Sequence, residues 1–383
     1  MPKRIINVGL IGCGLMGREF ASAAARWLYL PDLEFEPRIV AVCSRTRASM
    51  EWFQRNVPSV CLATTDYREV LDSPDVDVVY CAVPHNLHAQ IYADTISAGK
   101  HLFGEKPFGI DLEANTAILD AVRQHPGVLV RCASQFAFYP GAYRLVQWID
   151  EGRFGRIIEV EAGFWHSSDL NPRKPINWKR KIDINGEYGC MGDLGMHILH
   201  IPVRSGWQPR NVRALLSKIV DERPDGEGRM VPCETWDNAI LACDADSGDQ
   251  CFPLLWSMKR IAPGHANTWY LRVLGTELSA EYTTQNPKQM AFLPYTPGGE
   301  QAWHVIDVPY RSAYPAIAGG IFEFGFSDAI LQMWAAFFDE LVNGPNMAQP
   351  FYCATPHEAA HSHRLFTAAL ESQRTAQTIA VES

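Results

Sequence analysis

The stretch INVGLIGCGLMGREF, residues 6–20, decides how the first part of this chain folds. The run before its glycines, Ile5–Ile11, is short, apolar and rich in β-branched residues, as a buried parallel strand is. The run after them, Leu15–Leu30, is rich in alanine and predicts a helix. A strand, a turn of the form G-x-G-x-x-G and a helix in close succession are typical of a dinucleotide-binding unit.

Each glycine of this turn has a separate predicted role. Gly12 permits the tight turn, Gly14 lets the backbone approach a pyrophosphate, and Gly17 lets the helix pack closely against the strand. The unpaired N–H groups at the start of the helix then point at the phosphates. The alternative is a glycine-rich turn that binds nothing. We predict a nucleotide cofactor contacted by five turn residues: Gly12, Cys13, Gly14, Leu15 and Met16.

The composition is that of a globular protein with room for two domains. The chain has 383 residues, of which 47% are hydrophobic and 20% charged, enough for two cores. Its formal charge of −9 argues against a nucleic-acid partner, and no apolar stretch is long enough for a membrane span. The glycines near the start belong to the predicted fold, so we expect no signal peptide and a cytoplasmic protein.

The ten cysteines form no C-x-x-C pair. Several lie in apolar strand-like runs, such as Cys43 in IVAVC and Cys81 in VDVVYCAV. We interpret them as reduced core residues. A structural zinc site is the alternative, but we predict no metal.

The pattern of strand-like and helical runs changes near Ser134. Up to that point strand-like and helical runs alternate, which indicates an α/β domain with a parallel sheet covered on both faces. We assign residues 1–134 to a Rossmann NAD(P)-binding domain. Its predicted strands are Ile5–Ile11, Ile39–Cys43, Val60–Ala63, Val76–Ala82, His101–Phe103 and Val128–Cys132.

We assign residues 135–383 to an α+β domain for substrate binding and oligomerisation. Long alternating runs separated by polar turns such as DERPDGEGR predict a large, mostly antiparallel open sheet. Two helical stretches near the end are Ser327–Asn343 and Thr355–Gln377. The exposed face of such a sheet needs cover, so we expect a homodimer or a homotetramer. Its predicted strands are Ile157–Trp165, Val212–Val220, Asn238–Ala245, Cys251–Met258, Trp269–Leu274 and Leu278–Tyr282.

The end of the second predicted strand bears on which dinucleotide binds. An NAD-binding fold usually carries an acidic residue there, which holds the ribose 2′-hydroxyl, but this chain reads Cys43-Ser44-Arg45-Thr46-Arg47. A hydroxyl followed by arginines suits a 2′-phosphate, which a guanidinium grips through several hydrogen bonds. We predict that Ser44 and Arg45 contact the cofactor and that NADP is preferred over NAD. The alternative is that Arg45 and Arg47 are solvated charges that open a helix.

Two further loops at the ends of predicted strands carry candidate residues. Pro84 breaks the chain after the fourth strand, where ligands of open α/β sheets bind. After the fifth strand comes GEKPFG, residues 104–109, in which Lys106 stands between an acid and a proline that favours an extended backbone before it. The two histidines here could equally be polar loop residues. Six cofactor contacts are predicted in these loops: Val83, Pro84, His85, His88, Glu105 and Lys106.

In combination these segments resemble the Gfo/Idh/MocA family of oxidoreductases, over nearly the whole chain. The glycine turn, VPHNLHAQ after the fourth strand and EKP at 105–107 match in order. EGRFGRII resembles the entry to the family's second domain, NWKRK at 177–181 its Trp-Lys/Arg segment, and GCMGDLGMHILH at 189–200 its Asp-x-x-x-His helix. The tail HEAAHSHRLFTAALESQRTAQTIAV is similar to the family's final helix and strand. The resemblance implies an NAD(P)-dependent dehydrogenase or reductase acting on the CH–OH groups of a sugar or polyol.

The resemblance also implies catalytic roles. The family's lysine, which lies by the nicotinamide and the substrate hydroxyl, corresponds to Lys106, and its acid and base correspond to Asp193 and His197. The last two are i and i+4, so on a helix they share one face. An imidazole can remove a proton from an alcohol as hydride leaves carbon, and an ammonium can stabilise the alkoxide. Asp193 could orient the imidazole or bind a second hydroxyl; without the resemblance, His197 reads as a structural histidine.

The substrate is less well defined. Trp165 and Trp178 could stack on a sugar ring, although Trp165 is interpreted as core. His200 stands where many members carry an acid, and Ala137 where arginine is common. Two alternatives remain, an NAD-dependent glycoside hydrolase and a non-catalytic NAD(P)-sensing regulator. The predicted substrate contacts are Lys106, Trp178, Lys179, Asp193 and His197.

Overall fold

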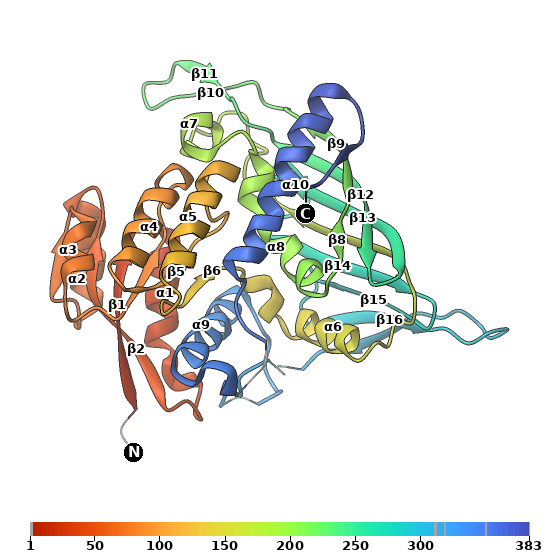
Figure 1. The fold of residues 1–383 in the computed structure, drawn as a ribbon, viewed down its shortest axis with the longest axis horizontal. Helices are drawn as coiled ribbons and strands as arrows, with labels where there is room; N and C mark the ends of the chain where they lie inside the picture. The colour runs from red at the N-terminus through yellow and green to blue at the C-terminus, as the bar shows by residue number, and fades with distance from the viewer. Residues whose placement is uncertain (1–2, 310–311, 318, 349–350, 383) are drawn as a thin grey trace. The chain divides into compact units, whose positions relative to one another are not determined.

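The computed structural model describes residues 3–309, 312–317, 319–348 and 351–382 (Figure 1). The outer ends of the two predicted domains, residues 1 and 383, lie outside these ranges. The chain forms two compact units, Met1–Phe138 with Tyr310–His357, and Tyr139–Pro309 with Glu358–Ser383. They are called unit 1 and unit 2 below. No helix in the described residues is long and apolar enough to cross a membrane.

Unit 1 is built on a six-stranded parallel sheet with the order β3-β2-β1-β4-β5-β6. The order reverses between β1 and β4, and ligands of such sheets bind at the carboxyl ends of the strands beside this point. The strands are β1 (Arg4–Ile11), β2 (Phe35–Cys43), β3 (Leu62–Thr64), β4 (Val78–Cys81), β5 (His101–Gly104) and β6 (Val130–Cys132). The helices are α1 (Leu15–Ala25), α2 (Arg47–Asn56), α3 (Tyr67–Asp72), α4 (His88–Ser97), α5 (Leu112–Gln124) and α9 (Phe326–Asn343), with 3-10 turns η1 (Trp27–Tyr29), η2 (His85–Leu87), η3 (Gln135–Phe138) and η5 (Gly344–Asn346).

The predicted Rossmann sheet is confirmed, with one helix shorter than expected. The run predicted as a helix to Leu30 leaves the α-helix after Ala25 and continues as η1. The buried Trp27 donates its indole N–H to the carbonyl oxygen of Phe35 at 2.7 Å. This side-chain bond fixes the chain as it turns toward β2, which the alanine-rich composition did not indicate.

Unit 1 also contains a helix that the sequence division assigned to the second domain. Helix α9 packs on α1, and its Trp334 ring lies 3.9 Å from Phe20 and 4.5 Å from Phe103, between ring centroids. Arg131 of β6 pairs with Glu340 of α9, with a bond of 2.8 Å from Nε to Oε2. The division by contacts therefore differs from the predicted one, because α9 is apolar over most of its surface and completes the core of unit 1.

Unit 2 is built on a ten-stranded sheet with the order β17-β16-β15-β14-β7-β13-β12-β9-β18, and β8 pairs with β12. Among the described strands of this second sheet, β7 and β13 form the one parallel pair, so the sheet is mixed and mostly antiparallel, as predicted. Its strands are β7 (Ile157–Trp165), β8 (Gln208–Pro209), β9 (Asn211–Ser217), β12 (Asn238–Ser247), β13 (Gln250–Lys259), β14 (Thr268–Gly275), β15 (Leu278–Thr283), β16 (Gln289–Pro294), β17 (His304–Asp307) and β18 (Ile379–Ala380). The other elements are α6 (Pro140–Asp150), α7 (Ile182–Asn185), α8 (Cys190–Arg204), α10 (Pro356–Thr375), η4 (Trp178–Arg180) and the hairpin β10 (Glu222–Pro224) and β11 (Met230–Pro232).

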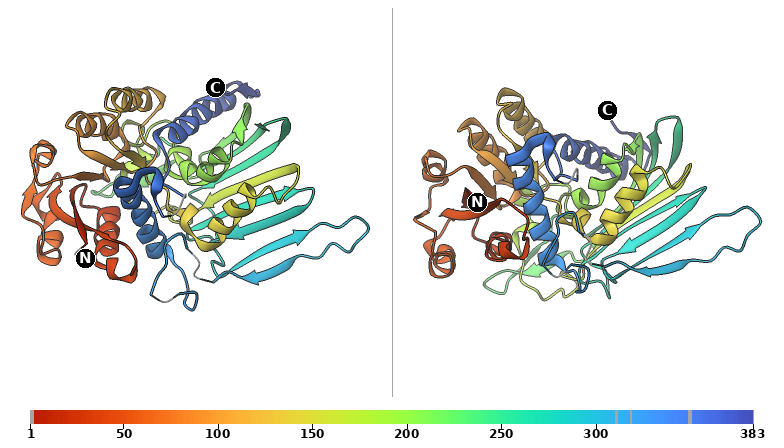
Figure 2. Two further views of the ribbon diagram at one scale, coloured as in Figure 1. Left: turned by 60° about the horizontal axis from the view of Figure 1, so that its bottom comes forward. Right: turned by 90° about the horizontal axis from the view of Figure 1, so that it is seen from below.

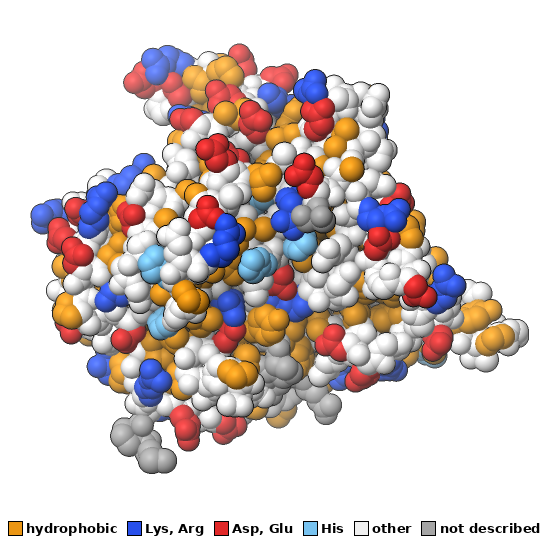
Figure 3. All heavy atoms as spheres, viewed as in Figure 1, with side chains coloured by type: hydrophobic (Ala, Val, Ile, Leu, Met, Phe, Trp, Pro, Cys, Tyr) orange, Lys and Arg blue, Asp and Glu red, His pale blue; other side chains and the backbone are white. Residues whose placement is uncertain are grey.

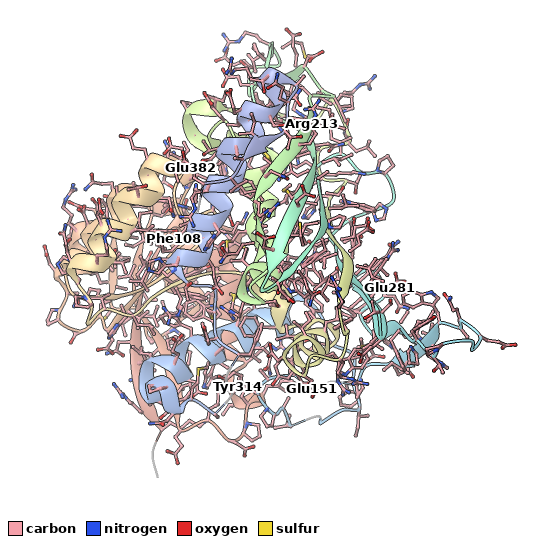
Figure 4. The ribbon with its side chains drawn as sticks, turned by 45° about the vertical axis from the view of Figure 1, so that its right-hand side comes forward. Phe108, Glu151, Arg213, Glu281, Tyr314 and Glu382 are labelled. Atoms are coloured by element: carbon pink, nitrogen blue, oxygen red, sulfur yellow. The ribbon has the colours of Figure 1, made fainter. Side chains whose placement is uncertain are left out.

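The long helices of unit 2, α6, α8 and α10, lie on one face of this sheet (Figure 2). Residues along β12 alternate between buried and exposed, which is the pattern of a sheet covered on one face. We call the other side the open face. One register row across it mixes apolar and charged residues: Arg213, Ala242, Leu255, Glu161, Arg272 and Glu281. Its Arg213 and Glu281 are labelled in Figure 4.

Candidate active site

The turn after β1 requires glycine at its first position. Gly12 has a φ of +106°, and a Cβ built there would lie 2.2 Å from the carbonyl oxygen of Ala82. Its N–H donates to the carbonyl oxygen of Cys43 at 2.9 Å. The turn is therefore packed between the ends of β2 and β4, and it requires glycine at position 12; the contact of Gly12 with a cofactor stays a prediction.

The other two glycines differ in their surroundings. A Cβ on Gly17 would lie 2.6 Å from the carbonyl oxygen of Gly12, so this glycine lets α1 approach the turn. A Cβ on Gly14 would meet nothing within 4 Å. Leu15, the first residue of α1, is 74% exposed, so the helix start and its N–H groups are open to solvent. Open space at Gly14 in front of a helix N-terminus fits a dinucleotide pyrophosphate.

The residues after β2 are placed at the same end of the sheet. Cys13 is buried and its thiol donates to the carbonyl oxygen of Cys43 at 3.6 Å. Arg45 and Arg47 are exposed where α2 begins, and neither pairs with a carboxylate among the described residues. Ser44 is half-buried and donates its N–H to Thr64. These positions are compatible with both interpretations of the arginines, cofactor contact and solvated charge.

The two loop histidines are both buried, and His88 has a defined role in the loop. Its Nε2 lies 3.1 Å from the carbonyl oxygen of Val83, and the N–H of Gly109 donates to its Nδ1 at 3.4 Å. Its ring stacks on Tyr92 with centroids 4.7 Å apart. Because His88 has no exposed surface, it joins the loop after β4 to the loop after β5 from inside. Its contact with the nicotinamide half of the cofactor stays a prediction.

Buried side chains fix the backbone on both sides of Lys106. Glu105 is buried, accepts a hydrogen bond from the Tyr80 hydroxyl at 2.8 Å, and offers its carbonyl oxygen to the Tyr92 hydroxyl at 2.8 Å. Lys106 itself is half-buried, and the peptide bond from it to Pro107 is cis. Burial and the Glu105 charge hold the pKa of Tyr80 well above its usual value, so its hydroxyl stays a donor.

The residue after Pro107 has an uncommon backbone conformation. Phe108, labelled in Figure 4, has a φ of +71° although it carries a bulky side chain. Asn115 of α5 donates its side-chain N–H to the Phe108 carbonyl oxygen at 2.9 Å, and Gly109 continues at positive φ. Such outliers persist only where surrounding contacts enforce them, and they cluster at functional sites. The loop 104–109 is therefore a candidate catalytic loop.

Helix α8 in unit 2 carries the predicted acid and base. Asp193 and His197 lie one turn apart in α8 and are both nearly buried. The His197 ring packs edge-on against Phe164 at 5.4 Å, and the Trp269 indole donates to the His197 carbonyl oxygen at 2.9 Å. The helix thus places both side chains on one face, as predicted.

The Asp193 carboxylate is held between two cations. Its Oδ1 accepts a hydrogen bond from Lys179 Nζ at 2.7 Å, and its Oδ2 accepts one from Arg260 Nη1. Lys179 lies in η4 beside Trp178, with its Nζ 5.6 Å from the Trp178 ring centroid. The structure therefore brings together three of the predicted substrate residues of unit 2 and adds Arg260, which the sequence did not indicate.

The remaining residues considered in the sequence analysis are buried or contact other side chains of the protein, or are free thiols. His200 and Ala137 are buried. Trp165 is half-buried on the open face, where its indole donates to Ser257 at 2.9 Å and its ring packs on Tyr270. All ten cysteines are free thiols, of which Cys61 and Cys251 are exposed.

Sequence reasoning missed the residues that support these side chains. Tyr80, Tyr92 and Asn115 face the catalytic loop from β4, α4 and α5. Asp169 and Arg260 support Asp193 from two loops. The one available signal was Arg260 itself, a charged residue directly after a long apolar strand.

Comparisons with known proteins show the family and the fold. A family model described as an oxidoreductase family with an NAD-binding Rossmann fold matches residues 6–132. The levoglucosan dehydrogenase of Pseudarthrobacter phenanthrenivorans is 30% identical over 306 residues, 75% of this chain and 76% of that protein. A solved levoglucosan dehydrogenase in complex with NADH and L-sorbose shares the fold with a TM-score of 0.87 at 22% identity, covering 99% of this chain and 100% of that one. An inositol dehydrogenase homologue complexed with NAD+ from Azotobacter vinelandii gives 0.81 at 19% identity, covering 99% of each chain.

The fold and the glycine turn define the class, an oxidoreductase with a dinucleotide-binding Rossmann unit. The chain belongs to the Gfo/Idh/MocA oxidoreductase family.

Proposed function

We propose that this protein is an NAD(P)-dependent dehydrogenase or reductase that transfers hydride between the nicotinamide and a CH–OH group of a sugar or polyol. The observation that carries the proposal is the candidate catalytic loop, in which Lys106 lies two residues before Phe108 with its positive φ and is bounded by buried hydrogen bonds. The relatives named levoglucosan dehydrogenase and D-xylose dehydrogenase support the substrate class.

The cofactor would be held mainly by backbone. Gly14 and the N–H groups of Leu15 and Met16 would take the pyrophosphate, and the Val83–Pro84 backbone would lie along the nicotinamide half. When bound, the nicotinamide supplies a hydride acceptor or donor. Buried Cys13 and His85 would shape the floor of this site rather than contact reacting atoms.

The chemistry on the substrate side is proton transfer and charge stabilisation. The Lys106 ammonium would stabilise the alkoxide that forms as the hydroxyl loses its proton. His197 would accept that proton, since an imidazole titrates near neutral pH. Lys179 would donate to another substrate hydroxyl, and Trp178 would offer an apolar ring face.

The preference for NADP over NAD is part of this proposal. β2 ends at Cys43 without a carboxylate. The exposed Arg45 follows directly after Ser44. A guanidinium in that place would pair with a 2′-phosphate. Comparing kcat/KM for the two cofactors tests this, and a tenfold or larger preference for NAD would end it.

Self-association through the open face is also proposed, as a homodimer or homotetramer. Leu215 and Ile240 are register partners there and are 58% and 46% exposed. Figure 3 shows the side of the molecule seen in Figure 1, on which charges of both signs are interspersed. Light scattering at micromolar concentration should give a multiple of the chain mass, and Ile240→Lys should lower it; a monomeric wild type refutes the proposal.

The experiment that tests the function is a screen of sugars, inositols and their keto forms with NAD and NADP. The absorbance of the reduced nicotinamide is the readout. Net reduction of the cofactor by a polyol supports the proposal. Release of an aglycone without net reduction would instead indicate a glycoside hydrolase. Cofactor binding without turnover of any compound would indicate a sensing protein.

A further inference from the structure

Unit 2 contains a buried chain of alternating charges that ends on Asp193. Asp237 accepts a hydrogen bond from Arg180 at 2.6 Å, and Arg180 also pairs with Asp169. Asp169 accepts a second bond from Arg260 Nε at 2.8 Å, and Arg260 pairs with Asp193. We call this series the charge chain. It links five residues from five different loops and helices of unit 2.

The charges of the chain are fixed by one another. Burial alone would raise the pKa of Asp169, but the charges and hydrogen bonds of Arg260 and Arg180 outweigh it and hold that pKa well below its usual range. Burial lowers the pKa of Arg260, and the Asp169 charge opposes this. A guanidinium between two carboxylates keeps its charge. Arg260 is therefore a rigid cation, with 7% of its side chain exposed.

The two oxygens of Asp193 face different environments. Oδ2 meets the interior cation Arg260, and Oδ1 meets Lys179, whose side chain is 29% exposed. A carboxylate between two cations stays ionised, and it cannot rotate without breaking a charge-assisted bond. Arg260 therefore fixes the Asp193 carboxylate. The carboxylate in turn fixes the Lys179 ammonium, which a ligand can reach.

We propose that Arg260 is a positioning residue for the reaction. It acts through Asp193 to hold the Lys179 ammonium in one place, from which Lys179 donates a hydrogen bond to a hydroxyl of the sugar or polyol. Asp193 remains an anion throughout and gives up no proton. This inference rests on the proposed function and assigns to it a residue that aligns the substrate.

A double-mutant cycle tests whether Arg260 acts through Lys179. Arg260→Lys and Lys179→Met should each lower kcat/KM for the polyol by about tenfold to a hundredfold, because misplacement by an ångström has effects of this size. The double variant should be no slower than the slower single variant. The Kd for NAD(P), measured by nicotinamide fluorescence, should not change. Additive losses would overturn the inference.

The chain offers two matched controls. Arg223 is equally buried, but its guanidinium donates to the backbone oxygens of Asn171, at 2.7 Å, and Asp169. Lys181 is exposed and lies two residues beyond Lys179. Arg223→Lys and Lys181→Met should keep kcat/KM within about twofold of wild type. A loss in these variants as large as in the test variants would mean that general destabilisation explains both and would overturn the inference.

A pH profile gives a readout that a purely structural role would not move. In Arg260→Met the cation beside Asp193 is lost, so protonation of the groups around it, Asp193 and His197, becomes more favourable and the acid limb of kcat/KM shifts to higher pH. An unshifted acid limb contradicts the inference, and Arg260→Lys supplies the comparison if the methionine variant does not fold.

The inference can fail separately from the proposed function. If wild type turns over no polyol with either cofactor, the proposed function fails. A crystal structure of Arg260→Lys then decides the inference: Asp193 and Lys179 should leave their mutual 2.7 Å contact. Unchanged positions of both side chains would overturn it.

Discussion

The glycine turn of unit 1 and the charge chain of unit 2 hold their candidate residues in opposite ways. The turn is backbone, made within residues 12–17, and its tight contacts are to main-chain atoms such as the Ala82 carbonyl. The charge chain is made of side chains from loops and helices far apart in sequence. A backbone site depends on small residues that leave room, whereas a side-chain site depends on partners that must all be present.

The largest effect is expected at Gly12. Gly12→Ala would place a Cβ 2.2 Å from a backbone oxygen at a φ of +106°, which should lower the free energy of unfolding by more than about 4 kcal/mol and abolish cofactor binding. Gly99→Ala is the control, since Gly99 also has positive φ but open space, and should cost about 1–2 kcal/mol. Urea unfolding measures both, and equal losses would show that backbone crowding at the turn is unimportant.

The next effect is expected at the centre of the charge chain. Asp169→Asn leaves two buried guanidinium groups short of an anion and should lower the free energy of unfolding by about 3–5 kcal/mol near neutral pH. Because the folded-state pKa of Asp169 is depressed, its contribution is full above the ordinary carboxyl pKa and is lost as pH falls below about 4. The difference in the free energy of unfolding between wild type and Asp169→Asn should therefore become smaller at acid pH. A gap independent of pH would contradict the assigned charge.

Lys106→Ala should lower kcat by about a hundredfold while leaving the Kd for NAD(P) largely intact. The reason is that the ammonium acts on the developing alkoxide, whereas the cofactor is held by backbone. Steady-state kinetics and fluorescence titration separate the two quantities. An unchanged kcat would remove Lys106 from the chemistry.

The smallest effect is expected at Gly14, where a substitution should change cofactor binding without changing the stability of the turn. Gly14 has an extended backbone and no atom within 4 Å of its Cβ position, so Gly14→Ala should leave the melting temperature unchanged. The methyl group would occupy room meant for the pyrophosphate and should weaken cofactor binding about tenfold. Gly127→Ala, also in open space, is the control and should bind normally. Normal binding by Gly14→Ala would show that the pyrophosphate lies elsewhere.

What could be predicted from the sequence follows the same contrast. The strand, turn and helix around Gly12 are set by neighbours a few residues away, and so is the shared face of Asp193 and His197 in α8. Arg260 and Asp169 meet only after folding, and no periodicity marks them. His88 shows a second limit, because a histidine in a ligand-binding loop can face inward, and only its partners, Val83 and Gly109, reveal that.

The grouping of α9 with unit 1 could not be predicted from the sequence for the same reason. Its apolar pattern predicted a buried helix correctly, but the pattern does not say which sheet it covers. The contact of Trp334 with Phe20 and Phe103 settles that, and both partners lie more than two hundred residues earlier in the chain.

The late position of α9 has a consequence for synthesis on the ribosome. All six strands of the Rossmann sheet emerge long before the helix that covers Phe20, Tyr80 and Phe103. This aromatic surface of the nascent chain stays exposed to water, or is covered by a chaperone, while every strand of the second sheet except β18 is translated. Unit 1 is thus completed only after α9 has been translated, and a chain that stopped before α9 would leave this aromatic surface uncovered.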